Sequence, residues 1–237
     1  GASKDIDTEI TITTWQSIYK LPRKWFEQFQ VVVGDEAHLF KAKSLTTIMS
    51  KLVDCPYKFG FTGTLDDSQT HKLVLEGLFG PVEKVVTTSE LIEQKHLAEL
   101  KINICILDHS KENKSKMARA SYRDEVNYII ACKPRNDFLI ELCKELKGNT
   151  LLLYALVEKH GKVLYDMAKE LDRPIFFIHG GVSGEERNEV RAIVEKEERA
   201  IIVASYGTFS TGVNIRRLNN IVFASPSKSK IRVLQSI

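Results

Sequence analysis

The sequence contains few of the residues that mark several common classes of protein. Its 237 residues include four cysteines, and none of them belongs to a Cys-x-x-Cys pair. This spacing argues against a zinc site or a thiol redox motif and is typical of small buried residues in a reducing compartment. No apolar run approaches the roughly 20 residues of a membrane span. From these absences we expect an intracellular, cytoplasmic protein without a membrane partner.

A strong charge of either sign is also missing. The formal net charge is +3, and 27% of the residues are charged while 43% are hydrophobic. This much apolar material is enough for a buried core, so disorder is not expected, and the length suits one or two domains. The mild basicity is compatible with a nucleic-acid partner and equally with an ordinary solvated surface.

An acidic pair follows a short apolar run near the start of the chain. Residues 31–38 read Val-Val-Val-Gly-Asp-Glu-Ala-His. We expect a buried strand over the valines, with Asp35 and Glu36 at its carboxyl end, where open α/β sheets bind their ligands. An Asp there can hold Mg²⁺ on a nucleoside triphosphate, and a neighbouring Glu can orient or activate water. The alternative is a surface turn with two solvated acids, and the three valines favour the nucleotide site.

Strand and helix patterns alternate along both halves, which predicts an α/β fold of mostly parallel sheets flanked by helices. The first half predicts strands over residues 9–14, 31–33 and 59–64, and helices that follow Pro22 or span 43–53 and 66–78. The second half predicts strands over 150–154, 175–178, 200–204 and 220–223. Its expected helices are 136–146 with Asn136 as the cap, 160–171, and a third running from Ser183 to about 198.

The two halves are expected to form separate domains. Residues 111–116 are polar and predict a loop or linker, and 117–131 are weakly helical in pattern. We place the junction near Lys133-Pro134. The expected domains are therefore 1–132, with a linker from about residue 100, and 133–237.

The Asp35-Glu36-Ala37-His38 run resembles the DEAH form of the Walker B box in superfamily 2 helicases and translocases. The resemblance implies two RecA-like lobes that share ATP and Mg²⁺ in a groove. Asp35 would bind the Mg²⁺, and Glu36 would position the attacking water. His38 would either link this strand end to the second lobe or cap the turn, and both roles stay open.

Two further stretches in the first half match the family's order of motifs. Residues 13–17, Thr-Thr-Trp-Gln-Ser, resemble box Ib, so Thr14 and Gln16 would hold nucleic-acid phosphates. Residues 61–65, Phe-Thr-Gly-Thr-Leu, resemble box III and lie one strand-helix unit after Asp35, so the two strand ends can be neighbours. The hydroxyls of Thr62 and Thr64 would then bond the carboxylates after the valines and couple the nucleotide to the nucleic acid. The plain alternatives are a strand-to-helix turn and a glycine-containing turn.

The second half carries a hydroxyl-rich loop, residues 205–215, that resembles box V. By this likeness Ser205 and Thr208 would contact the nucleic-acid backbone, and Gly212 and Asn214 would complete the nucleotide side. Many relatives have Asp at the position of Asn214. The His-Gly-Gly run at 179–181 precedes a capped helix, and it either contacts the nucleic-acid backbone or simply ends a strand.

Two motifs of the family are absent or incomplete. No Gly-x-x-x-x-Gly-Lys-Ser/Thr run occurs in the sequence. Residues 227–237 resemble the opening of box VI without the arginines that follow it in the family. We therefore expect an internal piece of a longer enzyme, with the first lobe and the end of the second truncated and with little ATPase activity of its own. A natural protein that has lost its P-loop is the alternative.

Within the superfamily, the motifs look most like those of phage recombination helicases. That likeness implies an ATP-dependent DNA helicase that unwinds or branch-migrates junctions, forks and R-loops in recombination and repair. Its partners would be branched or single-stranded DNA and possibly RNA–DNA hybrids. Two other functions stay open: a double-stranded DNA translocase that does not unwind, and a catalytically inactive nucleic-acid-binding module.

Overall fold

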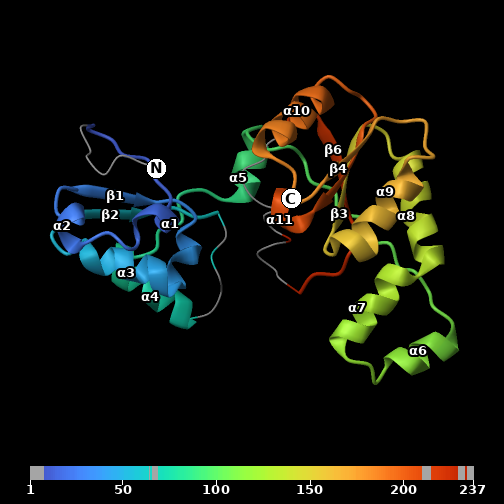
Figure 1. Cartoon of the computed structure of the whole chain (residues 1–237), viewed down its shortest axis with the longest axis horizontal. Helices are drawn as coiled ribbons and strands as arrows, with labels where there is room; N and C mark the ends of the chain where they lie inside the picture. Colours follow the sequence, from blue (N-terminus) through green and yellow to red (C-terminus); the bar gives the residue numbers. More distant parts are fainter. Residues whose placement is uncertain (1–7, 64, 66–68, 210–214, 229–232, 234–237) are drawn as a thin grey trace. The chain divides into compact units, whose positions relative to one another are not determined.

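The computed structural model describes residues 8–63, 65, 69–209, 215–228 and 233. The chain divides by contact into two compact units, Gly1–Ile102 and Asn103–Ile237 (Figure 1). Both units contain parallel strands with helices packed against them, so the predicted α/β class is confirmed. The contact boundary lies earlier than the junction predicted at Lys133-Pro134, because residues 103–132 cluster with the second unit. None of the described helices is long and apolar enough to cross a membrane.

The first unit contains a two-stranded parallel sheet. Strand β1 (Val31–Gly34) pairs with β2 (Tyr57–Gly60), with Val31 opposite Tyr57 and Gly34 opposite Gly60. Both strands therefore end at the same edge. The helical segments of the unit are α1 (Trp15–Ile18), α2 (Arg23–Phe26), the 3₁₀ turn η1 (Ala37–Lys41), α3 (Lys43–Lys51), α4 (Gln69–Phe79) and α5 (Thr88–Glu93).

One face of this sheet lies on the core of the unit. Figure 1 shows α3 and α4 on the same side of β1 and β2, and the buried side chains of Leu45, Ile48 and Met49 come from α3. Val32 packs against this core, whereas Val31 and Val33 are 51% and 61% exposed. The prediction of a fully buried strand is therefore wrong. Alternate residues of a strand point to opposite faces, and the described helices cover one face.

The predicted strand over residues 9–14 is also wrong, because these residues form no strand in the structure. Ile10 and Ile12 are 80% and 95% exposed. A strand needs a neighbour that accepts and donates its backbone hydrogen bonds, and alternation in the sequence does not supply one. The strand predicted over 59–64 lies earlier, at 57–60, so the described residues 61–63 follow it and are not part of it. The predicted helices of this unit agree with the structure to within a few residues.

The second unit contains a four-stranded, all-parallel sheet in the order β4-β5-β3-β6. The strands are β3 (Asn149–Tyr154), β4 (Ile175–Ile178), β5 (Ile201–Ser205) and β6 (Leu218–Phe223). The helical segments are α6 (Lys111–Met117), α7 (Tyr122–Ala131), α8 (Lys133–Glu145), the π turn η2 (Val157–Gly161), α9 (Lys162–Ala168), α10 (Gly184–Val194) and α11 (Tyr206–Phe209).

Both faces of this sheet are covered. Leu152 and Tyr154 of β3 pack into a core with α8 and α9, and their neighbours Leu151 and Leu153 pack into a second core with α10 and α11. Figure 1 shows the two helix pairs on opposite sides of the strands. Every residue of β3 is buried, as expected for a central parallel strand, and this explains the near-continuous apolar runs in the sequence.

Three predictions in this unit are wrong in detail. The expected linker at 111–116 is helix α6, because Ser110 caps it by accepting a hydrogen bond from the Asn113 amide. Helix α8 begins at Lys133, so Asn136 is not its cap but a buried residue inside it. The helix predicted to begin at His160 is shorter, since the chain first makes the π turn η2.

Candidate functional site

The acidic pair of the first unit lies beside the segment that follows β2. The amide of Phe61 donates to the Gly34 carbonyl at 2.9 Å, and the amide of Ala37 donates to the Phe61 carbonyl at 2.8 Å. These bonds continue the pairing of β1 and β2 beyond the strand ends. The Asp35-Glu36 turn and the Phe61-Thr62 segment are therefore neighbours, as the order of motifs predicts.

Two glycines allow this edge to pack closely on the core. A Cβ at Gly34 would lie 2.8 Å from Cζ of Phe40, and one at Gly60 would lie 3.0 Å from the ring of Phe79. These two phenylalanines contact each other edge to face, with their ring centroids 5.0 Å apart. The aromatic pair therefore sets how closely both strand ends approach the core. A larger residue at either glycine would push the strand end away from the two rings.

Glu36 has an unusual backbone conformation for a residue with a side chain. Its φ of 49° and ψ of 50° are left-handed, and its amide donates to Oδ1 of Asp35 at 2.8 Å. Such a conformation costs about 1–3 kcal/mol and persists where the surrounding structure imposes it, most often at functional sites. Asp35 is exposed and the Glu36 side chain is 39% exposed, so both carboxylates are accessible to a ligand.

His38 joins the acidic turn to the neighbouring segment. Its side chain is 4% exposed, and its Nδ1 atom lies 2.9 Å from Oγ1 of Thr62 and 3.2 Å from Oε2 of Glu36. A carboxylate oxygen can only accept, so Nδ1 carries the proton when it bonds to Glu36. The two predicted roles of His38, a link to the second lobe or a cap of the turn, stay open, and the contacts that the structure shows for its ring lie within the first unit. Thr64, the second predicted coupling residue, lies outside the described residues.

The predicted nucleic-acid contacts of the first unit lie at the start of α1. Thr14 is the residue before the helix, and its Oγ1 is 3.0 Å from Oγ of Ser17. Gln16 is in the first turn, and both Thr14 and Gln16 are exposed. They are accessible to a nucleic-acid backbone, and their roles stay predictions.

The predicted contacts of the second unit behave differently. Ser205 ends β5 and Thr208 lies in α11, and their hydroxyl oxygens are hydrogen-bonded to each other. Thr208 is only 5% exposed. One hydroxyl of the pair donates to the other, so the donating hydroxyl would have to change partner to reach a phosphate, while the accepting hydroxyl keeps its own hydrogen. Gly212 and Asn214 lie outside the described residues.

The sequence reasoning missed a buried polar cluster at the end of β6. His160 is fully buried, with Nδ1 2.8 Å from Oγ of Ser225 and Nε2 3.2 Å from Oδ1 of Asn136. The Asn136 amide nitrogen donates to the Ile130 carbonyl at 2.9 Å. The amide of Ala155 donates to Oγ of Ser225 at 3.0 Å. A lone histidine between two apolar segments gave no signal of this cluster in the sequence.

Counting donors and acceptors assigns the protons of this cluster. Since the NH₂ group of Asn136 faces a carbonyl, its oxygen faces His160 and must accept from Nε2–H. Nδ1 of the neutral ring then accepts from the Ser225 hydroxyl. Burial, with a smaller contribution from the Arg135 guanidinium, lowers the pKa of His160 to about 4, so the neutral ring that this pattern requires is the form present near pH 7.

The same strand end is held from two helices. The hydroxyl of Tyr206 in α11 donates to the Ser225 carbonyl at 2.7 Å, and Nη2 of Arg135 in α8 donates to the Ala224 carbonyl at 2.6 Å. These contacts and the His160 cluster fix the carboxyl end of β6. The residues that resemble the opening of box VI begin just beyond this point.

The donor set of the first unit suits a metal that keeps most of its water. The described residues contain no group of three or more His, Cys, Asp or Glu side chains that could enclose an ion. Mg²⁺ in nucleotide sites is held by one or two carboxylates together with substrate phosphates and waters. An exposed Asp35 at a strand end therefore fits such an ion, with Glu36 free for another role.

Comparisons with known proteins agree with the resemblance to helicases. Residues 1–67 match the family described as Type III restriction enzyme, res subunit. The chain is 37% identical over 244 residues to the ATP-dependent DNA helicase UvsW of Enterobacteria phage T4, covering 100% of the chain and 48% of UvsW. A putative ATP-dependent RNA helicase of Acanthamoeba polyphaga mimivirus is 23% identical over 219 residues, covering 86% of the chain and 39% of the relative. The chain thus spans half the length or less of these curated relatives.

Solved structures show the same fold. The crystal structure of T4 UvsW matches with a TM-score of 0.52 at 36% identity, covering 94% of the chain and 44% of UvsW. Dbp5 of S. cerevisiae, bound to RNA and ADP BeF3, matches with a TM-score of 0.55 at 15% identity, covering 94% of the chain and 54% of Dbp5. At that identity the Dbp5 match shows the fold alone. By its motifs and its alignment with UvsW, the chain is similar to superfamily 2 helicases.

Proposed function

We propose that this chain is part of the motor of an ATP-dependent DNA helicase, with Asp35 and Glu36 at its hydrolytic site. One observation carries the proposal. Two accessible carboxylates lie at the end of a parallel strand, and a buried His38 connects one of them to Thr62 on the neighbouring strand end. Homology to UvsW, an ATP-dependent DNA helicase, supplies the class of reaction.

The two acids are suited to different tasks. Asp35 is exposed, and the one backbone hydrogen bond that it accepts uses only Oδ1, so its carboxylate can still bind Mg²⁺. When bound, the ion would neutralise charge on the phosphates. The Glu36 side chain is held toward His38 by the left-handed turn. In the proposal Glu36 orients the attacking water and accepts its proton, a role typically worth 10²–10⁴-fold in rate.

The His38–Thr62 hydrogen bond supports a coupling role for Thr62. In the proposal, loss of the γ-phosphate moves the Glu36 carboxylate and so changes its contact with Nδ1 of His38, the nitrogen that also contacts Thr62. We propose that this route carries the state of the nucleotide to the nucleic-acid contacts. Thr14, Gln16, Ser205 and Thr208 would make those contacts to phosphates, which position a strand without reading its sequence.

The finer activity is proposed from the motif resemblance. It is the unwinding or branch migration of DNA junctions, forks and R-loops in recombination and repair, in the cytoplasm. The match of residues 1–67 to a restriction-enzyme subunit supports a second candidate, translocation on double-stranded DNA without unwinding.

The test uses the complete protein that contains this chain. DNA-stimulated ATP turnover and strand displacement on forked and linear duplexes are measured for the unmodified protein and for Glu36→Gln. We expect fork-preferring displacement that Glu36→Gln abolishes. Triplex displacement without strand separation would favour the translocase. Absence of ATP turnover, with or without DNA, would reject the motor and leave a binding module.

A further inference from the structure

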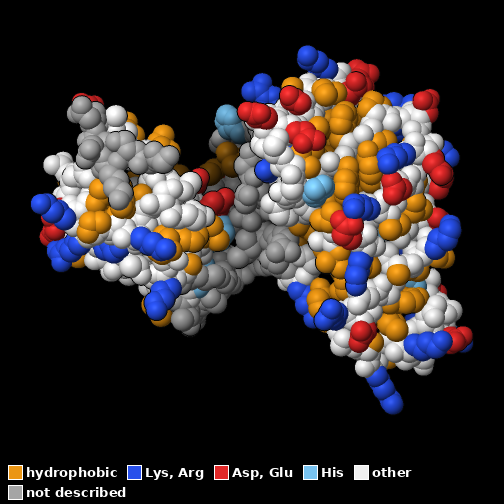
Figure 2. All heavy atoms as spheres, in the orientation of Figure 1, with side chains coloured by type: hydrophobic (Ala, Val, Ile, Leu, Met, Phe, Trp, Pro, Cys, Tyr) orange, Lys and Arg blue, Asp and Glu red, His pale blue; other side chains and the backbone are white. Residues whose placement is uncertain are grey.

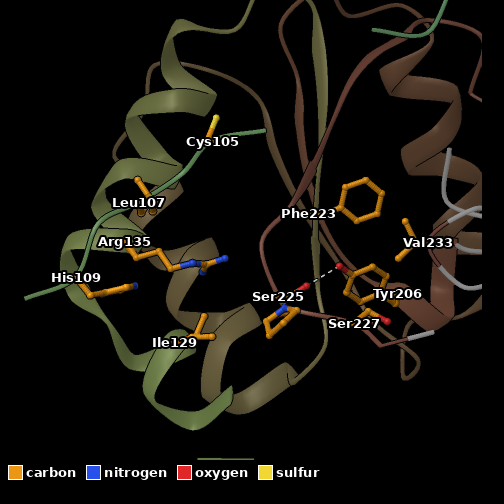
Figure 3. Close-up of a pocket in the computed structure, with 11 residues that line it drawn as sticks. Cys105, Leu107, His109, Ile129, Arg135, Tyr206, Phe223, Ser225, Ser227 and Val233 are labelled. Carbon is orange, nitrogen blue, oxygen red and sulfur yellow. Dashed lines mark hydrogen bonds between the residues drawn. The ribbon is translucent and has the colours of Figure 1, made fainter. Parts of the chain in front are cut away.

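The second unit contains a cavity of about 460 Å³ at the carboxyl end of β6 (Figure 3). All of its lining residues lie between Cys105 and Val233, so it belongs to this unit alone. They come from the stretch before α6, from α7, α8 and α11, and from the end of β6 and the segment that follows it. The volume is in the range of small-molecule sites, which occur at this edge of α/β sheets.

The lining combines one permanent cation with apolar walls. Arg135 supplies the cation, and none of the 11 residues that line the cavity carries a carboxyl group. Leu107, Ile129 and Phe223 supply the apolar surface. Figure 3 shows the Arg135 side chain extending from α8 into the space between Leu107 and Phe223. The electrostatic character of the cavity is therefore positive.

Arg135 has an unused donor. Its Nη2 atom donates to the Ala224 carbonyl at 2.6 Å, but Nη1 is buried and has no hydrogen-bond partner among the described residues. Within the same residues no acidic side chain forms an ion pair with Arg135. Burial of the guanidinium lowers its pKa, as expected for a cation removed from water. Arg135 as a whole is half-buried, and withdrawing part of a cation from water without a counter-ion has a free-energy cost that a bound anion would offset.

Neighbouring polar groups of the lining already have partners. The Tyr206 hydroxyl donates to the Ser225 carbonyl, and Oγ of Ser225 bonds to His160 and to the Ala155 amide. These hydrogen bonds fix Tyr206 and Ser225 within the protein, so neither group needs a ligand as its partner. The group that still lacks a partner is the inner nitrogen of Arg135.

We propose that this cavity binds a small organic anion, whose oxyanion accepts from Nη1 of Arg135 and whose body lies on Leu107, Ile129 and Phe223. Guanidinium N–H groups match carboxylate and phosphate oxygens, and such charge-assisted bonds are about twice as strong as neutral ones. The apolar walls indicate that the anion is carried on a larger body. The lining residues all belong to the second unit, whereas Asp35 and Glu36 belong to the first, and no step of the proposed motor function is needed for this anion to bind.

The test measures binding of four probes to the 237-residue chain by calorimetry, without Mg²⁺ or nucleic acid. Phenyl phosphate and benzoate carry an oxyanion on an aromatic body, inorganic phosphate is the anion alone, and phenol is the body alone. We expect saturable binding of phenyl phosphate or benzoate, at least 10-fold tighter than that of phosphate or phenol. Phosphate versus carboxylate preference is read from the first two probes.

Two variants identify the cation. Arg135→Gln removes the charge but keeps a donor for the Ala224 carbonyl, and we expect it to weaken binding about 10- to 100-fold. Arg123→Gln makes the same change on the exposed surface of α7 and should leave binding unchanged. Equal binding by Arg135→Gln and the unmodified chain, or no saturable binding by either organic anion, overturns the proposal. If inorganic phosphate binds as tightly as phenyl phosphate, the claim that the apolar residues bind the body of the anion is overturned.

A measurement on the unmodified chain guards against a variant that does not fold. Nitrogen-15 resonances of the arginine side chains are followed during titration with phenyl phosphate. The Arg135 signals should shift, while those of Arg173 should not, because its guanidinium already donates to the carbonyls of Leu146 and Gly148. Shifts of equal size at both arginines would indicate non-specific binding and reject the site.

Discussion

His38 and Thr62 are joined by a hydrogen bond between Nδ1 and Oγ1, 2.9 Å long, and the same nitrogen lies 3.2 Å from a carboxylate oxygen of Glu36. A buried ring thus contacts both the acidic turn after β1 and the segment after β2. The two segments are distant in sequence, but parallel pairing brings their strand ends together. The His38 ring therefore connects Glu36, where hydrolysis is proposed, to Thr62.

Replacing Glu36 with Gln should stop ATP turnover without unfolding the protein. Gln keeps the size and the ability to bond to His38 but cannot accept a proton, so we expect turnover of the complete protein to fall by 10²-fold or more. Nucleotide affinity should change little. Steady-state turnover and equilibrium nucleotide binding measure the two effects. A variant that still hydrolyses ATP at a tenth of the normal rate would remove Glu36 from the role of base.

Replacing Thr62 with Val should separate hydrolysis from unwinding. Val has the shape of Thr but no hydroxyl, so His38 loses its partner at residue 62. We expect the number of ATP molecules hydrolysed per base pair unwound to rise severalfold. Thr62→Ser keeps the hydroxyl and is the matched control, which should behave nearly as the unmodified protein. The same ratio in all three proteins would contradict a coupling role for Thr62.

Much of the fold follows from local patterns, and most of the errors arise where long-range contacts decide the structure. The apolar runs of the second unit predict its buried strands well, because both faces of that sheet are covered. Residues 9–14 and the three valines of β1 have the composition of strands, yet neither pairing partners nor the covering of a face can be read from local sequence. The motif order predicts that Glu36 and Thr62 are neighbours, but the role of His38 as their link depends on side-chain geometry.

The buried cluster around His160 was invisible for the same reason. Its members Asn136, His160 and Ser225 come from three distant segments, and each is an ordinary residue in its local context. Asn is a residue type that often caps helices, but tertiary hydrogen bonds place Asn136 inside α8 instead. Local propensity is a weak guide wherever such long-range bonds compete with it.

Replacing Gly34 with Ala should destabilise the first unit. The new Cβ would lie 2.8 Å from the Phe40 ring in a packed core, and overpacking of this kind typically costs about 1–3 kcal/mol. Both tryptophans of the chain lie in the first unit, so their fluorescence during denaturant unfolding reports on it.

Gly77→Ala is the matched control for this substitution. Gly77 lies inside α4, is exposed, and an added Cβ meets nothing within 4 Å. Ala is the better helix former, so this variant should be more stable by up to about 1 kcal/mol. Opposite signs are expected for the two substitutions. Equal effects would show that the Phe40 contact does not limit residue 34.

The stability of the second unit should depend on pH through His160. Its pKa is lowered to about 4 in the folded unit, against about 6.5 in an unfolded chain, so the unfolded state binds more protons between these values. The contribution is fully present above pH 6.5, decreases as the pH falls, and is lost by about pH 4. The shift corresponds to roughly 3 kcal/mol, since one pKa unit is about 1.4 kcal/mol. Hydrogen exchange of the β3 amides, which belong to the buried centre of this unit, measures its opening free energy at each pH.

Carboxyl groups also titrate in this range, so the result is the difference between variants. His160→Gln cannot be protonated, and we expect a flatter profile between pH 6.5 and 4 together with lower stability near pH 7, because Gln fills the site between Asn136 and Ser225 less well than the ring. His96→Gln, at an exposed position, is the control and should reproduce the unmodified profile. Parallel profiles for His160→Gln and the unmodified chain would mean that His160 does not titrate differently in the two states, and the lowered pKa of the folded ring would have to be abandoned.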